Sequence, residues 1–183
     1  CIRDSDNPDL YDYMTGIKYL NFVADIFGVS AADRQDRIRQ YAGLFELTED
    51  LAQPIAAYSH GMKQKLAIIS AWLHRPRLIL MDEPFSAVDH LTKCTLQEEL
   101  INIRQAENKT VLFVTHDINE AVFLADRVVL LSPRPSTIQK IYEIPLEQKR
   151  GRSDPLLLKI AAEIAKDINS GGQDIPNNYW GNL

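Results

Sequence analysis

Two adjacent acids, Asp82 and Glu83, follow a run of four apolar residues at positions 78–81. Such a run is typical of a strand buried on both faces of a parallel sheet, and open α/β sheets bind ligands at the carboxyl ends of their strands. At such an end, Asp82 can hold Mg²⁺ through oxygen or water contacts, and Glu83 can orient or deprotonate an attacking water. Because an isolated acidic pair is more often a solvated turn, the hydrolytic interpretation needs further residues.

His116 is the first of these further residues. It ends the next predicted strand, within Thr-His-Asp at 115–117, one strand–helix–strand unit after Asp82. A right-handed crossover brings the ends of two such strands to the same side of the sheet. A lone histidine at a strand end is usually structural, but here His116 can donate a hydrogen bond to a terminal phosphate and stabilise developing charge.

A turn formed by Ser59, His60 and Gly61 precedes a helical pattern and is the third element. The free N–H groups at a helix N-terminus, together with the Ser59 hydroxyl, form an anion site. For an isolated Ser-x-Gly, a plain helix cap is the more frequent interpretation. The three elements together therefore predict phosphate chemistry more strongly than any one of them does.

The elements that must position these residues follow from hydrophobic periodicity. A first helix carries Tyr19, Phe22, Val23 and Ile26 at helical spacing. Strands alternate with helices, which indicates an α/β layered core. Helices are predicted at residues 15–27, 31–45, 59–75, 91–106, 118–125 and 154–168, and strands at 78–81, 110–115, 127–131 and, antiparallel, 137–144.

Composition limits the class of protein. The 183 residues are 45% apolar with a net charge of −5, which is ordinary for a globular domain and argues against nucleic-acid binding through a basic surface. Two cysteines do not make a disulfide framework, which fits a reducing compartment. No apolar stretch approaches the ~20 residues that span a bilayer, so we expect any membrane role to depend on a partner.

Four motifs in this order resemble the second half of an ATP-binding-cassette (ABC) nucleotide-binding domain. Residues 59–64, Ser-His-Gly-Met-Lys-Gln, are similar to the L-S-G-G-Q signature, with Tyr58, His60 and Met62 as departures. His60 either points outward, which we favour, or adds a donor near the phosphate. Residues 78–83 resemble the Walker B strand, residues 86–89 the D-loop and His116 the switch histidine. The implied fold is a partial, P-loop NTPase-like α/β cassette that comprises the helical subdomain and the second half of the parallel-sheet core.

The resemblance also implies a mechanism with ATP and Mg²⁺. Two such domains, alike or unlike, face head to tail, so Ser59 and Gly61 grip the γ-phosphate of the partner's nucleotide while Glu83 and His116 catalyse hydrolysis of the chain's own. The nucleotide-binding residues so implied are Ser59, His60, Gly61, Gln64, Asp82 and Asp89. Asp82 is also the expected Mg²⁺ ligand, with Asp6 as a weaker match to the metal-contacting glutamine. Transmembrane permease subunits are the further partner, at the cytoplasmic face of a bacterial cell membrane.

Expected domain boundaries follow from the motifs. Residues 6–75 form the helical subdomain with the signature, 76–146 the second half of the ATPase core, and 147–183 a C-terminal helix and mobile tail. Residues 1–5 resemble a translated sequencing adapter and are expected to be non-native. The chain contains no G-x-x-x-x-G-K-[ST] loop, which supplies most phosphate contacts; we therefore expect an N-terminal truncation and no ATPase activity from this chain alone.

The two parts of the chain resemble different subfamilies. Before the Walker B strand the sequence is similar to ATPases of ABC-2-type exporters, and after it to ATPases of nitrate, sulfonate, taurine or bicarbonate importers. This pattern indicates a hybrid, by recombination or by joining of sequence fragments, and favours import. An exporter ATPase remains the alternative, as does a non-catalytic module that donates only a signature to a partner; the transported compound is not indicated.

Overall fold

The computed structural model describes residues 11–86, 88–145 and 151–171. The expected non-native residues 1–5, Asp6 and the predicted tail from 172 onward lie outside them. The chain divides into two compact units between Val114 and Thr115, a boundary that falls inside the predicted segment 76–146. The first unit contains α1 (Gly16–Ile26), α2 (Ala31–Leu44), a 3₁₀ turn (Ile55–Ala57), α3 (His60–Leu73), β1 (Leu78–Asp82), α4 (His90–Glu107) and β2 (Thr110–Val114).

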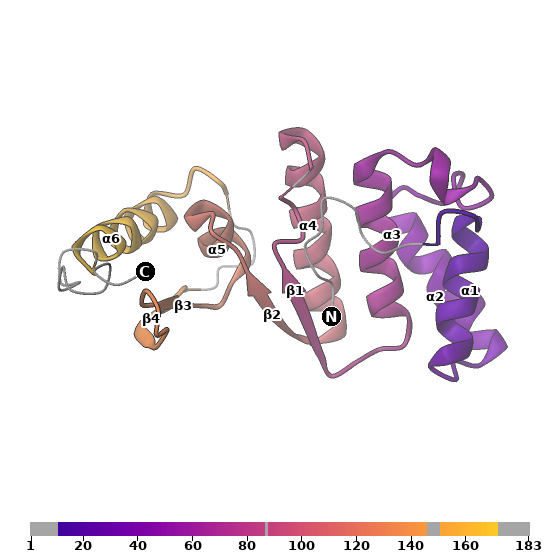
Figure 1. The fold of residues 1–183 in the computed structure, drawn as a ribbon, viewed down its shortest axis with the longest axis horizontal. Helices are drawn as coiled ribbons and strands as arrows, with labels where there is room; N and C mark the ends of the chain where they lie inside the picture. The colour runs from indigo at the N-terminus through magenta and orange to yellow at the C-terminus, as the bar shows by residue number, and fades with distance from the viewer. Residues whose placement is uncertain (1–10, 87, 146–150, 172–183) are drawn as a thin grey trace, which may run out of the picture. The chain divides into compact units, whose positions relative to one another are not determined.

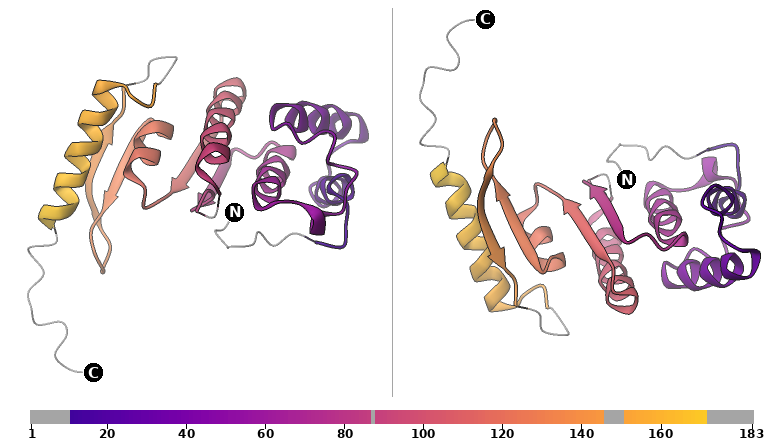
Figure 2. Two further views of the ribbon diagram at one scale, coloured as in Figure 1. Left: turned by 90° about the horizontal axis from the view of Figure 1, so that it is seen from above. Right: turned by 90° about the horizontal axis from the view of Figure 1, so that it is seen from below.

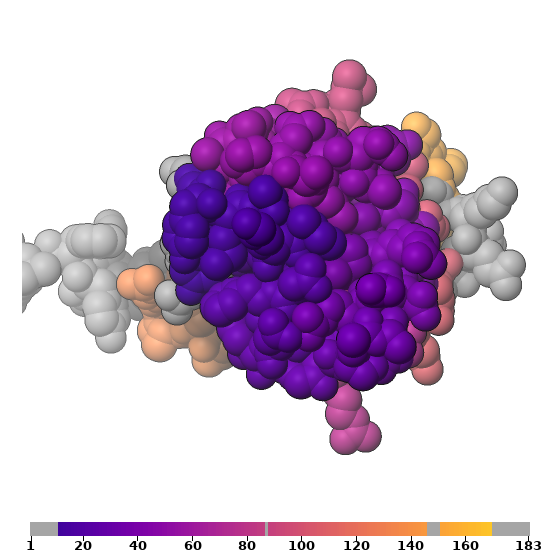
Figure 3. Space-filling view, turned by 90° about the vertical axis from the view of Figure 1, so that its right-hand side faces the viewer, coloured from indigo at the N-terminus to yellow at the C-terminus, as the bar shows by residue number. Residues whose placement is uncertain are grey.

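The helices of the first unit pack around α3, which contacts α1, α2 and α4 (Figures 1 and 2). Each helix begins at a capping side chain: Thr15, Ser30, Ser59 and Asp89 accept a backbone N–H from the first turn. The space-filling view shows α1 and α2 closely packed against the magenta residues that follow them (Figure 3). The fully buried large side chains of this helical part are Leu20, Tyr41, Phe45, Leu47, Ile55, Leu66, Ile68, Ile69, Trp72 and Leu73.

The predicted helices are confirmed, but the buried side of α1 differs from its predicted apolar stripe. Leu20 and Ala24 are fully buried, whereas Phe22 and Ile26 are exposed. Lys18, Asn21 and Asp25 share one side of α1, and the apolar residues cover a broad arc opposite them. The buried residues Gly16, Leu20 and Ala24 occupy one part of this arc. Gly16 permits close packing there, because an added Cβ would be 2.2 Å from the Tyr58 hydroxyl oxygen.

The strands β1 and β2 pair in parallel, with Asp82 opposite Val114. The prediction that β1 is buried on both faces is wrong for this chain: Ile79 and Met81 are buried, but Leu78 is exposed. In β2, Leu112 and Val114 are exposed as well. The faces of a parallel sheet are covered by helices and not by its own strands, and the three exposed residues share one face of the β1–β2 pair, which is therefore left open.

The second unit contains α5 (Ile118–Leu124), β3 (Arg127–Leu131), β4 (Ile138–Glu143) and α6 (Pro155–Gly171). As predicted, β4 is antiparallel to β3, and α6 lies along this hairpin (Figure 2). Its core consists of Val122, Tyr142, Ile144, Leu157 and Ile164. Lys140 also binds α6, through Glu163 and Asp167, both at 2.8 Å.

Candidate nucleotide site

Ser59 begins α3 and leaves its first N–H groups available. The Ser59 hydroxyl oxygen accepts the Met62 N–H at 3.3 Å, and its carbonyl accepts the Lys63 N–H at 3.0 Å. The N–H groups of the first helical turn have no partner within a helix, and they carry partial positive charge. This geometry can bind an anion, as the sequence predicts, and it is equally the geometry of an ordinary cap.

The segment that leads into this turn is bonded to the start of the described chain. The backbone N–H groups of Ala56 and Ile55 donate to the carbonyls of Asp12 (3.2 Å) and Met14 (2.8 Å). The Asp12 carboxylate also binds the Lys63 ammonium at 2.9 Å, one turn into α3. Sequence periodicity cannot find this pair, because the two residues are far apart in the chain.

The three other residues assigned to the signature behave differently from one another. His60 Nε2 is buried and has no hydrogen-bond partner, so the predicted outward orientation is wrong for this nitrogen. At Gly61 an added Cβ would be 2.9 Å from the Thr92 methyl carbon, so this glycine permits close packing against α4. Gln64 is 1% exposed, and its side chain would have to become exposed to touch a nucleotide.

Asp82 and Glu83 end β1 at the predicted edge. The Glu83 N–H donates to the Val114 carbonyl at 2.9 Å, which extends the pairing one residue beyond the strand. Glu83 has a φ of 47°, in the left-handed region that costs a residue with a Cβ about 1 kcal/mol or more. It marks a sharp turn of the backbone directly after β1; Glu46, Arg75 and Asn108 adopt the same region elsewhere in the described chain.

Asp89 is the N-cap residue of α4. Its carboxylate accepts the Thr92 N–H at 3.1 Å. Hydrogen bonds from the Thr92 hydroxyl and backbone N–H lower the pKa of Asp89, so it is anionic at neutral pH. Thr92 also contacts Gly61, so the predicted signature and D-loop segments meet at the start of α4.

His116 belongs to the second unit, so its position relative to Glu83 remains a prediction. Locally it precedes a well-formed helix start. The Asp117 side chain accepts the N–H groups of Asn119 (3.0 Å) and Glu120 (3.2 Å), and the Thr115 hydroxyl accepts the Asp117 N–H (3.0 Å). Val114, two residues earlier in the chain, is the partner of Asp82 in the sheet.

The carboxylates at the end of β1 fit the ligand preference of Mg²⁺. This ion uses one or two protein carboxylates together with waters and nucleotide phosphates, and Asp82 and Glu83 supply two. No group of three or more potential metal-ligating side chains occurs among the described residues. Asp6, the other predicted ligand, is not among them. Within the described part of the chain, every helix is too short or too polar to cross a bilayer.

Comparisons with known proteins match this arrangement. The family model described as ABC transporter matches residues 5–86. An ATP-binding protein of Brucella abortus biovar 1 is 35% identical over 153 residues, which are 84% of this chain and 59% of that protein. A nitrate import ATP-binding protein of Synechococcus elongatus is 41% identical over 140 residues, 74% of this chain and 51% of that protein. The solved dimeric structure of a bacterial ABC transporter cassette aligns with a TM-score of 0.62 and 24% identity, covering 76% of this chain and 60% of that one.

The fold is thus the mixed α/β fold of a nucleotide-binding cassette, covered in part. The chain belongs to the ATP-binding domains of ABC transporters, and its relatives include import ATPases. It spans 59% and 51% of the two curated relatives described above.

Proposed function

We propose that this chain is the signature-bearing and hydrolytic part of the ATPase subunit of an ABC importer, of the nitrate, sulfonate, taurine or bicarbonate type. The observation that carries the hydrolytic role is the end of β1, where Glu83 adopts a left-handed backbone directly after Asp82. ATP with Mg²⁺ is the cofactor, and the ion, when bound, neutralises charge on the transferred phosphoryl group. Asp82 holds the ion, weakly assisted by Asp6.

Glu83 orients or deprotonates the attacking water in this proposal, and His116 donates a hydrogen bond to the terminal phosphate. Ser59, His60, Gly61 and Gln64 bind the nucleotide of a second cassette, and Asp89 crosses the same interface. Support comes from the capped start of α3, whose free N–H groups can bind a phosphate, and from the dimeric state of the solved cassette.

Import is favoured over export by the extent of the relatives. The alignment with the nitrate import protein covers 74% of this chain, so it must extend on both sides of the Walker B strand. We propose that permease subunits and a second ATPase domain, alike or unlike, complete the transporter at the cytoplasmic face of a bacterial membrane.

The test is ATP hydrolysis by the protein of the complete reading frame, with its cognate permease in vesicles. Glu83→Gln should reduce the turnover rate by about 10²-fold or more, because it removes the group that prepares the water, while ATP binding is retained. Glu49→Gln, an exposed acid on the helical part, is the matched control and should leave turnover unchanged. The chain of 183 residues alone should bind ATP weakly and hydrolyse none.

The non-catalytic alternative predicts a different pattern. If the chain only donates a signature, Ser59→Ala should reduce hydrolysis by the partner cassette while Glu83→Gln has no effect. Turnover that is independent of Glu83 would contradict the proposed function. Uptake of the transported compound into right-side-out vesicles, compared with its efflux, would distinguish an importer from an ABC-2-type exporter.

A further inference from the structure

A groove of about 600 Å³ lies between the last turns of α2 and α4, within the first unit. The residues that line it are, on one side, Gln40, Tyr41, Gly43 and Leu44 and, on the other, Asn102, Ile103, Ala106 and Glu107. Its volume is within the range of small-molecule sites. No residue assigned to the nucleotide site lines it.

The electrostatic character of this groove is set by two helix ends. Both α2 and α4 end here, at Leu44 and Glu107, and the carboxyl end of a helix carries partial negative charge. Glu107 adds a full negative charge, and no lysine or arginine is among the lining residues. Three sources of negative potential therefore converge on one concave surface.

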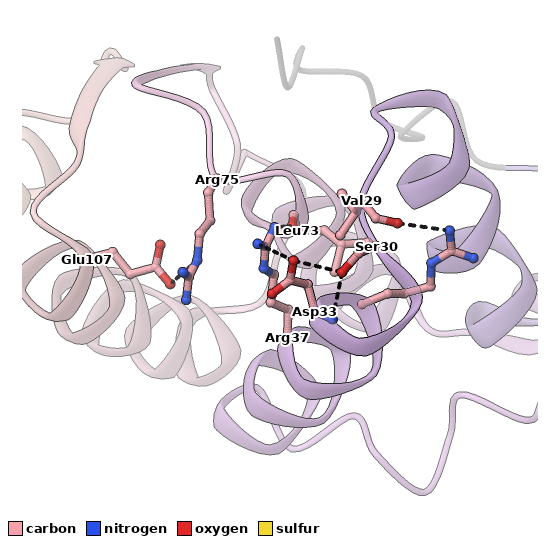
Figure 4. A network of polar contacts seen from close by, with 8 residues as sticks. Val29, Ser30, Asp33, Arg37, Leu73, Arg75 and Glu107 are labelled. Atoms are coloured by element: carbon pink, nitrogen blue, oxygen red, sulfur yellow. Dashed lines mark hydrogen bonds and ion pairs between the residues drawn. The ribbon is translucent and has the colours of Figure 1, made fainter.

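Glu107 itself is incompletely neutralised. Its side chain is 8% exposed, and the half-exposed Arg75 guanidinium is 3.8 Å away (Figure 4). The Tyr41 hydroxyl donates a hydrogen bond to Oε1, while Oε2 is buried and has no hydrogen-bond partner. A buried carboxylate oxygen without a donor is unfavourable, so this residue gains from an added donor.

Two neighbouring donors, Arg37 and Tyr41, are already engaged. Arg37 donates to the Leu73 carbonyl at 2.9 Å and pairs with Asp33 at 3.5 Å (Figure 4). Burial and the bond to Glu107 raise the pKa of Tyr41 to about 12, so its single proton is held in the existing bond at neutral pH.

We propose that this groove binds a small organic cation, a guanidinium or ammonium group on a short apolar chain. The cationic group lies against Glu107, and the apolar chain lies against Ile103 and Leu44, which line the groove. Such a ligand would contact α2 and α4 at once and would therefore restrict movement of one helix relative to the other. The inference does not depend on the proposed ATPase function.

The test is a nuclear magnetic resonance titration of the whole 183-residue chain with n-butylguanidinium, followed through backbone amides. Saturable shifts are expected at residues 40–44 and 102–107. Glu107→Gln should weaken binding about tenfold or more, because a charge-assisted bond becomes a neutral one. It keeps an acceptor for Tyr41, so the fold is retained, as the unchanged melting temperature of the variant should show. Glu49→Gln, which removes an equal charge outside the groove, should not weaken binding.

A second variant tests the site without changing any charge. An added Cβ at Gly43 would meet nothing within 4 Å, so Gly43→Leu should fill the groove and abolish binding in a folded protein. n-Butanol, which lacks the cation, should not bind. If the original chain, Glu107→Gln and Gly43→Leu bind n-butylguanidinium with equal affinity, the proposal is overturned. Binding at the groove by a tri-arginine peptide but not by n-butylguanidinium would also overturn it, in favour of a side chain of a partner protein.

Discussion

The helical part, residues 11–75, and the sheet formed by β1 and β2 bury their apolar residues in different ways. In the helical part, Trp72 is completely buried. In β2, Leu112 is 54% exposed although it lies in a regular parallel pair. The difference shows that the apolar side chains of the helical part are covered, with α3 also packed against α4, whereas the paired strands leave one face exposed.

The largest expected effect is in the helical core. Trp72→Ala should lower the free energy of unfolding by about 3–5 kcal/mol, because it removes a large buried ring and leaves a cavity. The measurement is urea denaturation followed by circular dichroism at 222 nm. Trp72→Phe, which keeps an aromatic ring, should cost clearly less. A loss below about 1 kcal/mol for the alanine variant would mean that this core does not hold the unit together.

A smaller effect is expected on the exposed face of the sheet. Leu112→Thr should change the free energy of unfolding by less than about 1 kcal/mol, because threonine suits a strand and little burial is lost. Ile79→Thr on the buried face of β1 is the matched control and should cost about 2 kcal/mol or more. Equal losses in the two variants, in the same denaturation assay, would show that Leu112 is covered in solution.

The smallest effects concern pH, which should act on the two units in different ranges. Burial lowers the pKa of His74, whose ring stacks on Phe27 at 3.8 Å. The folded helical part therefore binds this proton less readily than the unfolded chain, and its stability should fall as the pH drops below about 6.5. Hydrogen bonds from Lys140, then from Tyr142, lower the pKa of Asp167, so the second unit should lose stability only as the pH falls below about 4.

Hydrogen exchange resolved by residue would measure both units in one sample. His74→Gln should remove the loss of stability of the helical part between pH 6.5 and 5, and it should leave the stability of the second unit unchanged. Asp167→Asn should do the reverse at lower pH. Simultaneous loss of protection in both units near pH 6 would contradict this assignment.

Sequence patterns predicted the elements better than their surroundings. The strand at Arg127–Leu131 has its predicted bounds, and Ser59 caps α3 as expected, because both depend on local residue order. The part of the broad apolar arc of α1 that is buried was not predicted, since it depends on contacts with residues distant in the chain, such as that of Gly16 with Tyr58.

The candidate site shows the same division. Asp82 and Glu83 end β1 as predicted, because a strand end is a local property. The left-handed backbone of Glu83, the buried nitrogen of His60 and the Asp12–Lys63 pair were not foreseen. Each of these depends on residues that are distant in the chain, and spacing carries no information about them.

The helix α4 connects the signature turn with the end of α2. At 1.5 Å per residue its 18 residues form a rod of about 27 Å. Asp89 and Thr92 join one end to Gly61, and Glu107 joins the other to Tyr41. Because a helix of this length is stiff along its axis, a displacement of the signature turn at one end shifts the contact with Tyr41 at the other.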